Sequence, residues 1–428
     1  MSKKINTTPI SGMQEFLPAT QATFDQIKSE ISKVYRTHGF QHIETPTIDR
    51  NEVLFAKAGG DTEKQIYRVI KTTESADASD QSLRFDHTVP LARYIVEHES
   101  NLNFPFRVTQ IGRNFRGERA QKGRFREFYQ CDVDIIGRGE LPLVYDSQVI
   151  YTFYSALCTF VKTPIKIRLN NRKYVSGVLE SLGLSDKAAD IYSIIDHSEK
   201  VPAEKTQKSL EELGLSEDNV VKITTLINTH GNYDTIARLG YENVGLAELK
   251  QVYQELIDLG LEDVVEIDLK IVRGLDYYTG TVFEAVLPEY PELGSIGGGG
   301  RYDNLASNYT DQKVPGVGAS IGLSRLFYVL RVNGLLDDNS SNSATPIIDY
   351  AIIPLDQSAR KTAYRLAEKL RKEDSTTDVI LANKKLGDLM KHAAKIAKYG
   401  IVIGENEVKS HTVKIKDFAT GQQTDFKF

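Results

Sequence analysis

The sequence lacks tryptophan and contains only three methionines and two cysteines among its 428 residues. The two thiols, Cys131 and Cys158, cannot form a disulfide framework or a thiolate metal site, and the eight histidines show no HExxH pattern. We therefore expect reduced cysteines and no metal held by protein ligands. No apolar run approaches the roughly 18 residues that a membrane span needs. The patterns GxGxxG and GxxxxGK[ST] are also missing, which argues against a dinucleotide fold and a P-loop.

Length and composition, with 40% hydrophobic and 26% charged residues, are typical of a globular protein of two or three domains. The N-terminal stretch MSKKINTTPIS carries charge without an apolar segment after it, so we expect no secretory signal, no membrane contact and a cytoplasmic location. The net charge of -5 argues against indiscriminate nucleic-acid binding, but the charge is segregated. Residues 170–262 carry a net -7, whereas residues 346–428 carry a net +4 and form either a polyanion-binding surface or an ordinary basic one.

The most basic stretch is residues 104–137, FPFRVTQIGRNFRGERAQKGRFREFYQCDVDIIG. Within it, residues 107–126 hold seven Arg or Lys against one acid, Glu118, and such a charge density suits phosphate. Alternating polar and apolar residues predict two strands joined by a polar turn at 117–123. One face of the returning strand carries Arg126, Phe128, Gln130, Asp132 and Asp134. The hairpin is either a polar ligand site with a basic tip or an edge hairpin that its charges protect against aggregation.

Upstream, apolar residues at steps of three and four predict an amphipathic helix over Thr20–His38, with Thr20 as its N-cap and Gly39 as its C-terminal stop. The extended segment that follows carries Pro46, which favours an edge or interface position. A long helix that leads into such a strand could pair two subunits, so we expect a homodimer. Further helices are predicted at 91–98 and 146–160.

Downstream, residues 172–261 have Leu, Ile and Val at helical spacing, which predicts an acidic helical insert. The next segment, IVRGLDYYTGTVFE (271–284), predicts two strands around glycines that present Arg273 and two tyrosines. It is either a site for a carboxylate, phosphate or aromatic ligand, or a hairpin whose tyrosines pack on a core. The four glycines at 297–300 are weak evidence by themselves. VGASIGLSRL (317–326) predicts a strand that passes into a helix and presents Arg325.

A polar segment rich in Ser, Asn and Asp, LLDDNSSNSAT (335–345), is the best linker in the chain. After it, strands and helices are predicted to alternate and to end in a hairpin that turns at Thr420 and Gly421. Strands are expected at 350–353, 378–381 and 401–403, with helices at 360–371 and 385–398. This alternation predicts an α/β domain with a partly parallel sheet.

Several of these segments together resemble the histidyl-tRNA synthetase family of class II aminoacyl-tRNA synthetases, over essentially the whole chain. Pro46 and its preceding helix are similar to motif one, FRGE (115–118) to motif two, and Gly316–Arg325 to motif three. RGLDYYTG (273–280) is similar to the signature of the histidine enzymes. RFDHTVPLARY (84–94) resembles the segment that receives the amino acid.

The resemblance implies an α+β fold, with a class II antiparallel-sheet catalytic core, a helical insertion and a C-terminal α/β anticodon-binding domain. The expected order is a first part of the core (1–170), the insertion (171–261), a second part of the core (262–334), a linker (335–345) and the anticodon-binding domain (346–428).

The same resemblance implies roles for individual residues. The catalytic cations on the α-phosphate are Arg116 and Arg273. The residues implied to bind histidine are Asp86, His87, Thr88, Gln130, Asp134, Tyr277 and Tyr278. Among them, Asp86, Thr88 and Gln130 are implied to take the α-amino group. Asp134, Tyr277 and Tyr278 are implied to surround the imidazole. ATP is implied to contact Arg116, Glu118, Arg124, Phe128 and Arg325, with the adenine between Phe128 and Arg325. The tRNA acceptor end is implied to meet Arg119, Gln121 and Lys122.

The implied reaction joins L-histidine and ATP, which brings Mg²⁺, into histidyl-adenylate and then transfers histidine to the 3′ end of histidine tRNA. Two other readings stay open. A synthetase-like regulatory subunit of ATP phosphoribosyltransferase shares this core, but such proteins typically lack the anticodon domain and degrade the RGLDYYTG and motif-two signatures. A synthetase for threonine, proline or glycine shares the core and the type of tail but not the tyrosine pair.

Overall fold

The computed structural model describes residues 5–56, 63–73, 79–272, 277–336 and 348–428. The chain divides into two compact units, one of Met1–Glu15 with Phe24–Leu336 and the other of Phe16–Thr23 with Asp337–Phe428. Each unit has its own sheet.

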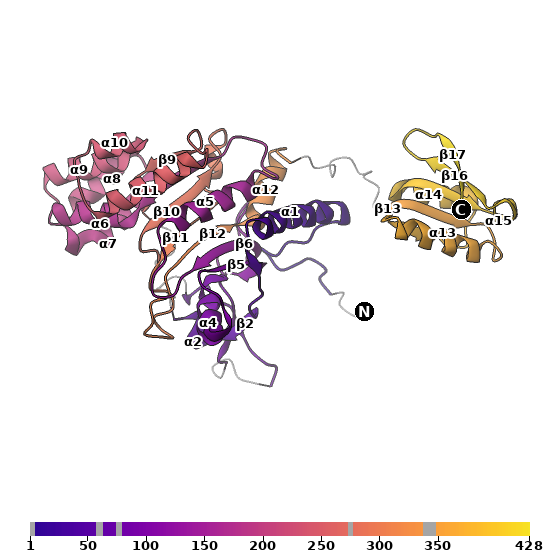
Figure 1. Ribbon diagram of the computed structural model, residues 1–428, viewed down its shortest axis with the longest axis horizontal. Helices are drawn as coiled ribbons and strands as arrows, with labels where there is room; N and C mark the ends of the chain where they lie inside the picture. Colours follow the sequence, from indigo (N-terminus) through magenta and orange to yellow (C-terminus); the bar gives the residue numbers. More distant parts are fainter. Residues whose placement is uncertain (1–4, 57–62, 74–78, 273–276, 337–347) are drawn as a thin grey trace. The chain divides into compact units, whose positions relative to one another are not determined.

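A nine-stranded sheet forms the centre of the first unit, in the order β1-β5-β6-β12-β11-β10-β7-β9-β8 (Figure 1). Its strands are β1 (Gln41–His42), β5 (Phe106–Phe115), β6 (Glu127–Ile136), β7 (Lys166–Asn171), β8 (His230–Gly231), β9 (Val265–Asp268), β10 (Thr281–Val286), β11 (Gly297–Tyr302) and β12 (Gly316–Ile321). From β5 to β7 every neighbouring pair is antiparallel, whereas β1 joins β5, and β9 joins β7, in parallel. The fold is therefore α+β with a sheet that is mainly antiparallel, as predicted.

The predicted basic hairpin is confirmed as β5 and β6, which pair over their whole length. Because strand side chains alternate, β6 has two distinct faces. One face buries Cys131, Val133 and Ile135 completely. The other face presents Gln130, Asp132 and Asp134. The polar face is thus supported from behind by an apolar core.

Three helices lie on the apolar face of the sheet: α1 (Pro18–Thr37), α5 (Val144–Leu157) and α12 (Leu323–Val332). In α1 the Tyr35 hydroxyl donates to the carbonyl of Cys131 at 3.1 Å. The predicted N-cap at Thr20 is wrong, because α1 already begins at Pro18. Proline suits the first helical turn, since its φ is fixed and its missing N–H has no partner there. The predicted stop is correct: Gly39 has φ of 83°.

Residues between α1 and β5 form a second, small sheet of three strands. It consists of β2 (Ile48–Arg50), β3 (Arg68–Val69) and β4 (Gln81–Leu83), and it leads into α2 (Asn51–Leu54) and α4 (Thr88–His98). The extended segment around Pro46 is therefore divided. Its first part, β1, is the edge of the large sheet, its last part enters the small sheet, and Pro46 itself lies between the two strands.

Six helices follow β7 and gather at one end of the first unit, beside β9 and β10 (Figure 1). They are α6 (Arg172–Ser181), α7 (Ala188–His197), α8 (Ala203–Glu212), α9 (Glu217–Asn228), α10 (Tyr233–Ala237) and α11 (Val244–Asp258). Helix α11 packs on α5 and α6 and on β7, which attaches the group to the sheet.

The second unit contains a five-stranded sheet of order β14-β13-β15-β16-β17. Its elements are β13 (Ile348–Pro354), α13 (Arg360–Lys372), β14 (Thr377–Val379), α14 (Leu386–Ile396), β15 (Ala397–Ile403), α15 (Glu405–Ser410), β16 (Thr412–Asp417) and β17 (Gln423–Lys427). Strand β13 pairs in parallel with β14 and β15, and the last strands are antiparallel. The predicted α/β alternation is confirmed, although α15 was not predicted. Among the described residues no helix is long and apolar enough to span a membrane.

Candidate active site

A pocket of about 350 Å³ opens on the polar face of the large sheet, over β6, β12, β11 and β10. Seven of the residues implied by the family resemblance line it together: Arg116, Glu118, Arg124, Phe128, Gln130, Tyr278 and Arg325. The remaining lining residues are Gly123, Phe125, Ile271, Phe283, Glu284, Ser295, Ile296, Gly297, Gly298, Gly299, Ser320 and Gly322. The first group is strongly cationic, and the second supplies apolar and hydroxyl surface.

Glycine lets the strands under this pocket come close together. A Cβ on Gly299 would lie 1.9 Å from the carbonyl oxygen of Gly318 on the neighbouring strand. A Cβ on Gly318 would lie 1.9 Å from Oδ1 of Asp134. Side chains at these positions would collide with backbone or with a buried carboxylate. The four glycines of β11, which are weak evidence as a sequence pattern, are therefore required by the floor of the site.

Arg116 is held between two aromatic rings. Its Cζ lies 4.2 Å from the ring centroid of Phe85 and 5.0 Å from that of Phe128, and its Nε donates to the carbonyl of Phe85 at 3.4 Å. Burial lowers the pKa of the Arg116 guanidinium, and Asp86 and Glu118 oppose that shift. An arginine stays protonated even so, because its reference pKa is above 12. The pocket wall therefore carries a fixed positive charge with a planar donor fork.

The other cations stand around the opening. Arg124 Nη1 lies 3.4 Å from Oε2 of Glu118, and Arg325 Nη2 donates to the carbonyl of Leu293 at 2.8 Å. Helix α12 presents Arg325, as the sequence predicted. At the hairpin tip the side chains of Arg119, Gln121 and Lys122 are exposed, outside the pocket lining.

A group of acids and tyrosines extends the site toward α4. Asp86 Oδ1 accepts a hydrogen bond from the backbone N–H of Val89 at 3.0 Å, which places its carboxylate at the N-terminus of α4. Tyr302 donates to Asp134 Oδ1 at 2.7 Å. The rings of Tyr277 and Tyr278 contact each other edge to face, with centroids 5.1 Å apart, and Tyr277 contacts Tyr302 at 5.8 Å.

Burial controls protonation in this group. Burial and, after it, the neighbouring Asp132 raise the pKa of Asp134 to about 8, although the Tyr302 hydroxyl opposes the shift. Burial also raises the pKa of Asp86, and it holds the pKa values of Tyr277 and Tyr278 far above neutrality. The tyrosines are therefore neutral hydrogen-bonding groups. The cations therefore line the pocket, whereas the buried carboxylates of Asp86 and Asp134 lie outside its lining, next to Tyr278, which does line it.

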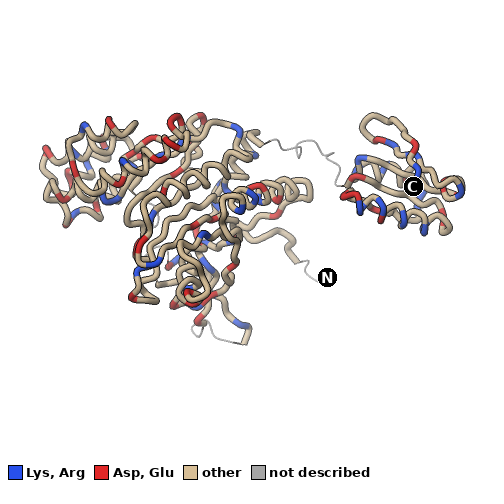
Figure 2. Tube along the Cα trace, viewed as in Figure 1, with Lys and Arg blue, Asp and Glu red and all other residues tan. Residues whose placement is uncertain are grey.

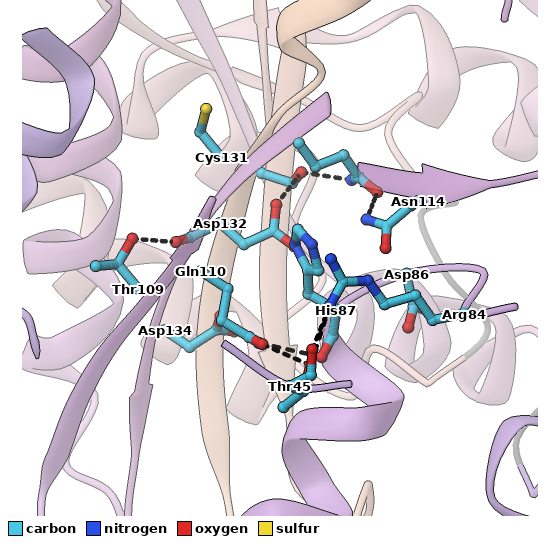
Figure 3. A network of polar contacts seen from close by, with 12 residues as sticks. Thr45, Arg84, Asp86, His87, Thr109, Gln110, Asn114, Cys131, Asp132 and Asp134 are labelled. Carbon is cyan, nitrogen blue, oxygen red and sulfur yellow. Dashed lines mark hydrogen bonds and ion pairs between the residues drawn. The ribbon is translucent and has the colours of Figure 1, made fainter. Parts of the chain in front are cut away.

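Four side chains form a continuous hydrogen-bond network along β6 (Figure 3). Asn114 Nδ2 donates to Gln130 Oε1 at 2.8 Å, and Gln130 Nε2 donates to Ser320 Oγ at 2.6 Å. The Ser320 hydroxyl donates in turn to Asp132 Oδ1 at 2.5 Å. Gln130 and Ser320 both line the pocket, so the network reaches its surface.

His87 lies at the far end of this network. Its Nδ1 is 3.0 Å from Asp132 Oδ2, its ring is 1% exposed, and its Nε2 has no hydrogen-bond partner among the described residues. His87 borders a second hollow, of about 600 Å³, between α1, β1 and β5. Gln110 joins His87 to the N-terminal segment, since it donates to the His87 carbonyl at 3.2 Å and accepts from Thr45 at 2.8 Å. The ring thus faces Asp132 and this second hollow, while the neighbouring Asp86 belongs to the acidic group.

An ion-pair cluster lies across β10, β7 and β9 on the pocket side of the sheet and touches the helical insertion. Arg168 Nη1 contacts Glu284 Oε1 at 2.7 Å, and its Nη2 contacts Asp268 Oδ2 at 2.6 Å. Nη2 also contacts Glu199, which lies just after α7. Glu284 lines the pocket, so this cluster connects the pocket wall to the insertion.

Some residues that contact the site have no assigned role in the sequence analysis, and one predicted residue lies outside the described part of the chain. Ser320 and Tyr302 received no role, although RYD after four glycines and the alternation of β12 were visible signals. Asp132 was placed on the polar face without a role. In the predicted strand pair at 271–284, Ile271 and Val272 are not in a strand, whereas β10 is present. Arg273 lies outside the described residues.

The described residues also bear on metal binding. In the part of the chain that the structure describes, no group of three or more His, Cys, Asp or Glu side chains is arranged to hold a metal ion. A divalent cation that accompanies a nucleotide needs fewer protein ligands, because phosphate oxygens and waters complete its coordination. The cationic pocket suits phosphate, with Glu118 and Glu284 as the acids among its lining residues.

Comparison with known proteins gives concordant matches. A family model described as histidyl-tRNA synthetase matches residues 12–326, and one described as an anticodon binding domain matches residues 349–428. A histidine–tRNA ligase of Clostridium tetani is 43% identical over 424 residues, which are 97% of this chain and 94% of that protein. A histidine–tRNA ligase of Clostridium acetobutylicum is 39% identical over 440 residues, 99% of this chain and 98% of that protein.

Solved structures agree with these relatives. The crystal structure of histidyl-tRNA synthetase from Nostoc sp. PCC 7120 has a TM-score of 0.86 and 33% identity, and the match covers 99% of this chain and 97% of that one. A structure from Bacillus halodurans, described as an ATP phosphoribosyltransferase regulatory subunit/histidyl-tRNA synthetase, has a TM-score of 0.75 over 91% of this chain and 97% of that one, and at 23% identity it shows likeness of fold alone. Because one family model covers residues 12–326 and relatives 39–43% identical extend over nearly the whole chain, this protein belongs to the histidyl-tRNA synthetase family.

Proposed function

We propose that this chain joins L-histidine to ATP, giving histidyl-adenylate and pyrophosphate, and then transfers histidine to the 3′-terminal adenosine of histidine tRNA. Family membership supports the reaction class. The observation that carries the proposal is the division of the site: Arg116 lies between two aromatic rings in the pocket lining, and buried carboxylates lie next to that lining, beside Tyr278. A nucleotide phosphate requires the first feature, and an amino acid with an ammonium and an imidazole requires the second.

ATP occupies the cationic end in this proposal. Phe128 and Arg325 take the two faces of the adenine ring, and Glu118 accepts from its amino group. Arg116 binds the α-phosphate, with Arg124 on the other phosphates and Arg273 as a second cation on the α-phosphate by family resemblance. Mg²⁺ arrives with ATP and neutralises phosphate charge.

Histidine occupies the end near α4. Asp86, Thr88 and Gln130 take its α-ammonium, since an ionised carboxylate and an amide oxygen can both accept hydrogen bonds. Asp134, Tyr277 and Tyr278 surround the imidazole. Asp134 accepts from an imidazole N–H, a contact that a purely apolar side chain of similar size cannot make. Such a buried acceptor gives strong discrimination, because a ligand without the N–H leaves it unpaired.

The chemistry follows from this placement. A histidine carboxylate oxygen attacks the α-phosphorus, the new P–O bond forms, and the bond to pyrophosphate breaks. Negative charge builds up on the α-phosphate oxygens, and the desolvated guanidinium of Arg116 stabilises this charge. No covalent enzyme intermediate is needed, since alignment and charge stabilisation supply the acceleration.

The remaining parts bind tRNA and pair subunits in this proposal. Residues 346–428 bind the anticodon, and the exposed tip residues Arg119, Gln121 and Lys122 meet the acceptor end. Two chains associate through α1 and β1, beside the hollow of about 600 Å³, in an isologous dimer that works in the cytoplasm. Sedimentation that shows only a 47.9 kDa monomer at micromolar concentration would contradict the dimer.

The test is pyrophosphate exchange into ATP by the intact chain with a panel of amino acids. Exchange is expected with histidine and at background with threonine, proline and glycine. Activity with one of those three instead would identify a synthetase of different specificity. No exchange with any amino acid would favour the regulatory-subunit alternative.

A further inference from the structure

The direction of every hydrogen bond in the network along β6 is fixed by one group, Asp132. An ionised carboxylate can only accept, and Asp132 is surrounded by two donors, Ser320 Oγ at 2.5 Å and His87 Nδ1 at 3.0 Å. The single Ser320 proton is therefore committed to Asp132. Ser320 Oγ can then only accept from Gln130, which it does at 2.6 Å from Nε2.

This order orients the Gln130 amide. Its nitrogen end points to Ser320, and its oxygen end points to Asn114, whose Nδ2 lies 2.8 Å away. One lone pair of Gln130 Oε1 remains for a ligand. An ammonium has donors only, so it needs the oxygen end of this amide. An amide turned by 180° would present N–H groups to the ammonium and repel it.

Asn114 does not by itself prevent that reversal. Its Oδ1 is buried without a hydrogen-bond partner among the described residues, so a turned Asn114 would accept from a turned Gln130. The only group in the chain of four that cannot reverse its role is the carboxylate of Asp132.

We propose that Asp132, acting through Ser320, is a positioning residue that keeps the oxygen of Gln130 available to the α-ammonium of the amino acid. His87 has the supporting role of donating to Asp132 from the opposite side, which is why it faces away from the pocket. The inference rests on the proposed function, in which Gln130 binds that ammonium.

The test compares two ligands that differ only in the ammonium, L-histidine and 3-(imidazol-4-yl)propanoate. Their dissociation constants are measured by calorimetry on the intact chain without ATP. In Ser320→Ala the amide loses its fixed direction, so histidine affinity should fall about tenfold, the worth of one charged hydrogen bond, while the analogue should be unaffected. Asp132→Asn should act in the same direction.

Two matched variants separate this effect from general damage. Ser324→Ala removes another buried serine hydroxyl beside β6, one that accepts from the backbone N–H of Tyr129 at 2.8 Å on the opposite face, and it should leave the ratio of the two constants unchanged. Asp134→Asn acts on the imidazole and should weaken both ligands together. Ser320→Ala carries the test alone where Asp132→Asn does not fold.

The possible outcomes separate the proposed role of Gln130 from the proposed role of Asp132 and Ser320. Wild-type protein that binds the two ligands equally would contradict the proposed role of Gln130 itself. Wild type that prefers histidine, together with a Ser320→Ala variant that keeps the full preference, would overturn the role of Asp132 and Ser320 alone.

Discussion

Asp134 is the residue whose surroundings most strongly predict a pH dependence. Its carboxyl is buried beside Asp132 and Asp86, with Tyr278 near and the Tyr302 hydroxyl as donor, and its pKa is about 8 against an ordinary value of 3.8. Between these values the folded protein holds a proton that the unfolded chain has released. Stability from this group is therefore fully present below about pH 4 and is lost as pH rises through 8.

We expect the free energy of unfolding to contain a component from Asp134 that falls by up to about 1.4 kcal/mol per pH unit between pH 5 and 8. Asp134→Asn, which cannot ionise, should remove this component. Denaturant titrations of both proteins at several pH values measure it as a difference in slope. Parallel slopes for the two proteins would show that Asp134 ionises normally in the fold.

Substitutions of Arg116 test its proposed role in the chemical step. If its guanidinium stabilises charge on the α-phosphate, Arg116→Ala should slow histidine activation about 100- to 1,000-fold, or ~3–4 kcal/mol. Arg116→Lys should recover only part of the rate, because an ammonium lacks the planar fork and packs less well between Phe85 and Phe128. Single-turnover activation rates report this effect. A normal rate with a raised KM for ATP would make Arg116 a binding residue only.

The position of a site residue can be predicted from the sequence when the residues that determine it are close to it in the chain. The polar face of β6 follows from alternation along one strand, and Arg325 follows from a strand-to-helix boundary. The contacts of Ser320 with Asp132 and of Tyr302 with Asp134 join strands about 170 to 190 residues apart in the chain. Their register depends on how β12 and β11 enter the sheet, and no local pattern records that.

Among the elements, the β5–β6 hairpin combines two tasks. Its strands are fixed by ten paired positions, whereas its tip beyond Gly117 has exposed polar side chains. Charge and alternation predict the hairpin, with its returning strand over 125–135, but the strand begins at Glu127, two residues later. A tertiary contact accompanies this boundary: the Arg126 N–H donates to the Gly12 carbonyl at 2.7 Å, while the Arg126 carbonyl still accepts from the Arg116 N–H at 2.9 Å.

The hairpin tip should act on tRNA more than on ATP. Gln121 is exposed, and an amide can contact a base edge, whereas the tip cations mainly position phosphate. Histidine tRNA is expected to carry an extra 5′ guanosine. Gln121→Ala should weaken charging of this tRNA and leave adenylate formation nearly unchanged. Comparing aminoacylation with pyrophosphate exchange for this variant measures the separation. An equal loss in both steps would refute the assignment to the acceptor end.

In the whole molecule, the two units divide the proposed work. Every described residue of the candidate site comes before Leu336, whereas the second unit carries a strongly basic helix, α13 (Figure 2). A fragment that ends at Leu336 should keep histidine activation and lose much of its tRNA charging. Rates of both steps for the fragment and the intact chain check this. Undiminished charging by the fragment would remove the second unit from tRNA binding.

The proposed function requires that one site hold histidine and the adenosine phosphate at once. Its most direct test is the affinity of the intact chain for a stable histidyl-adenylate analogue, such as histidyl-sulfamoyl-adenosine, measured beside L-histidine, ATP and the corresponding alanyl analogue. We predict that the histidyl analogue binds at least about 100-fold more tightly than L-histidine or the alanyl analogue, because it fills both parts of the site. Equal affinity for the two analogues, or affinity no greater than that of histidine alone, would contradict the proposed function.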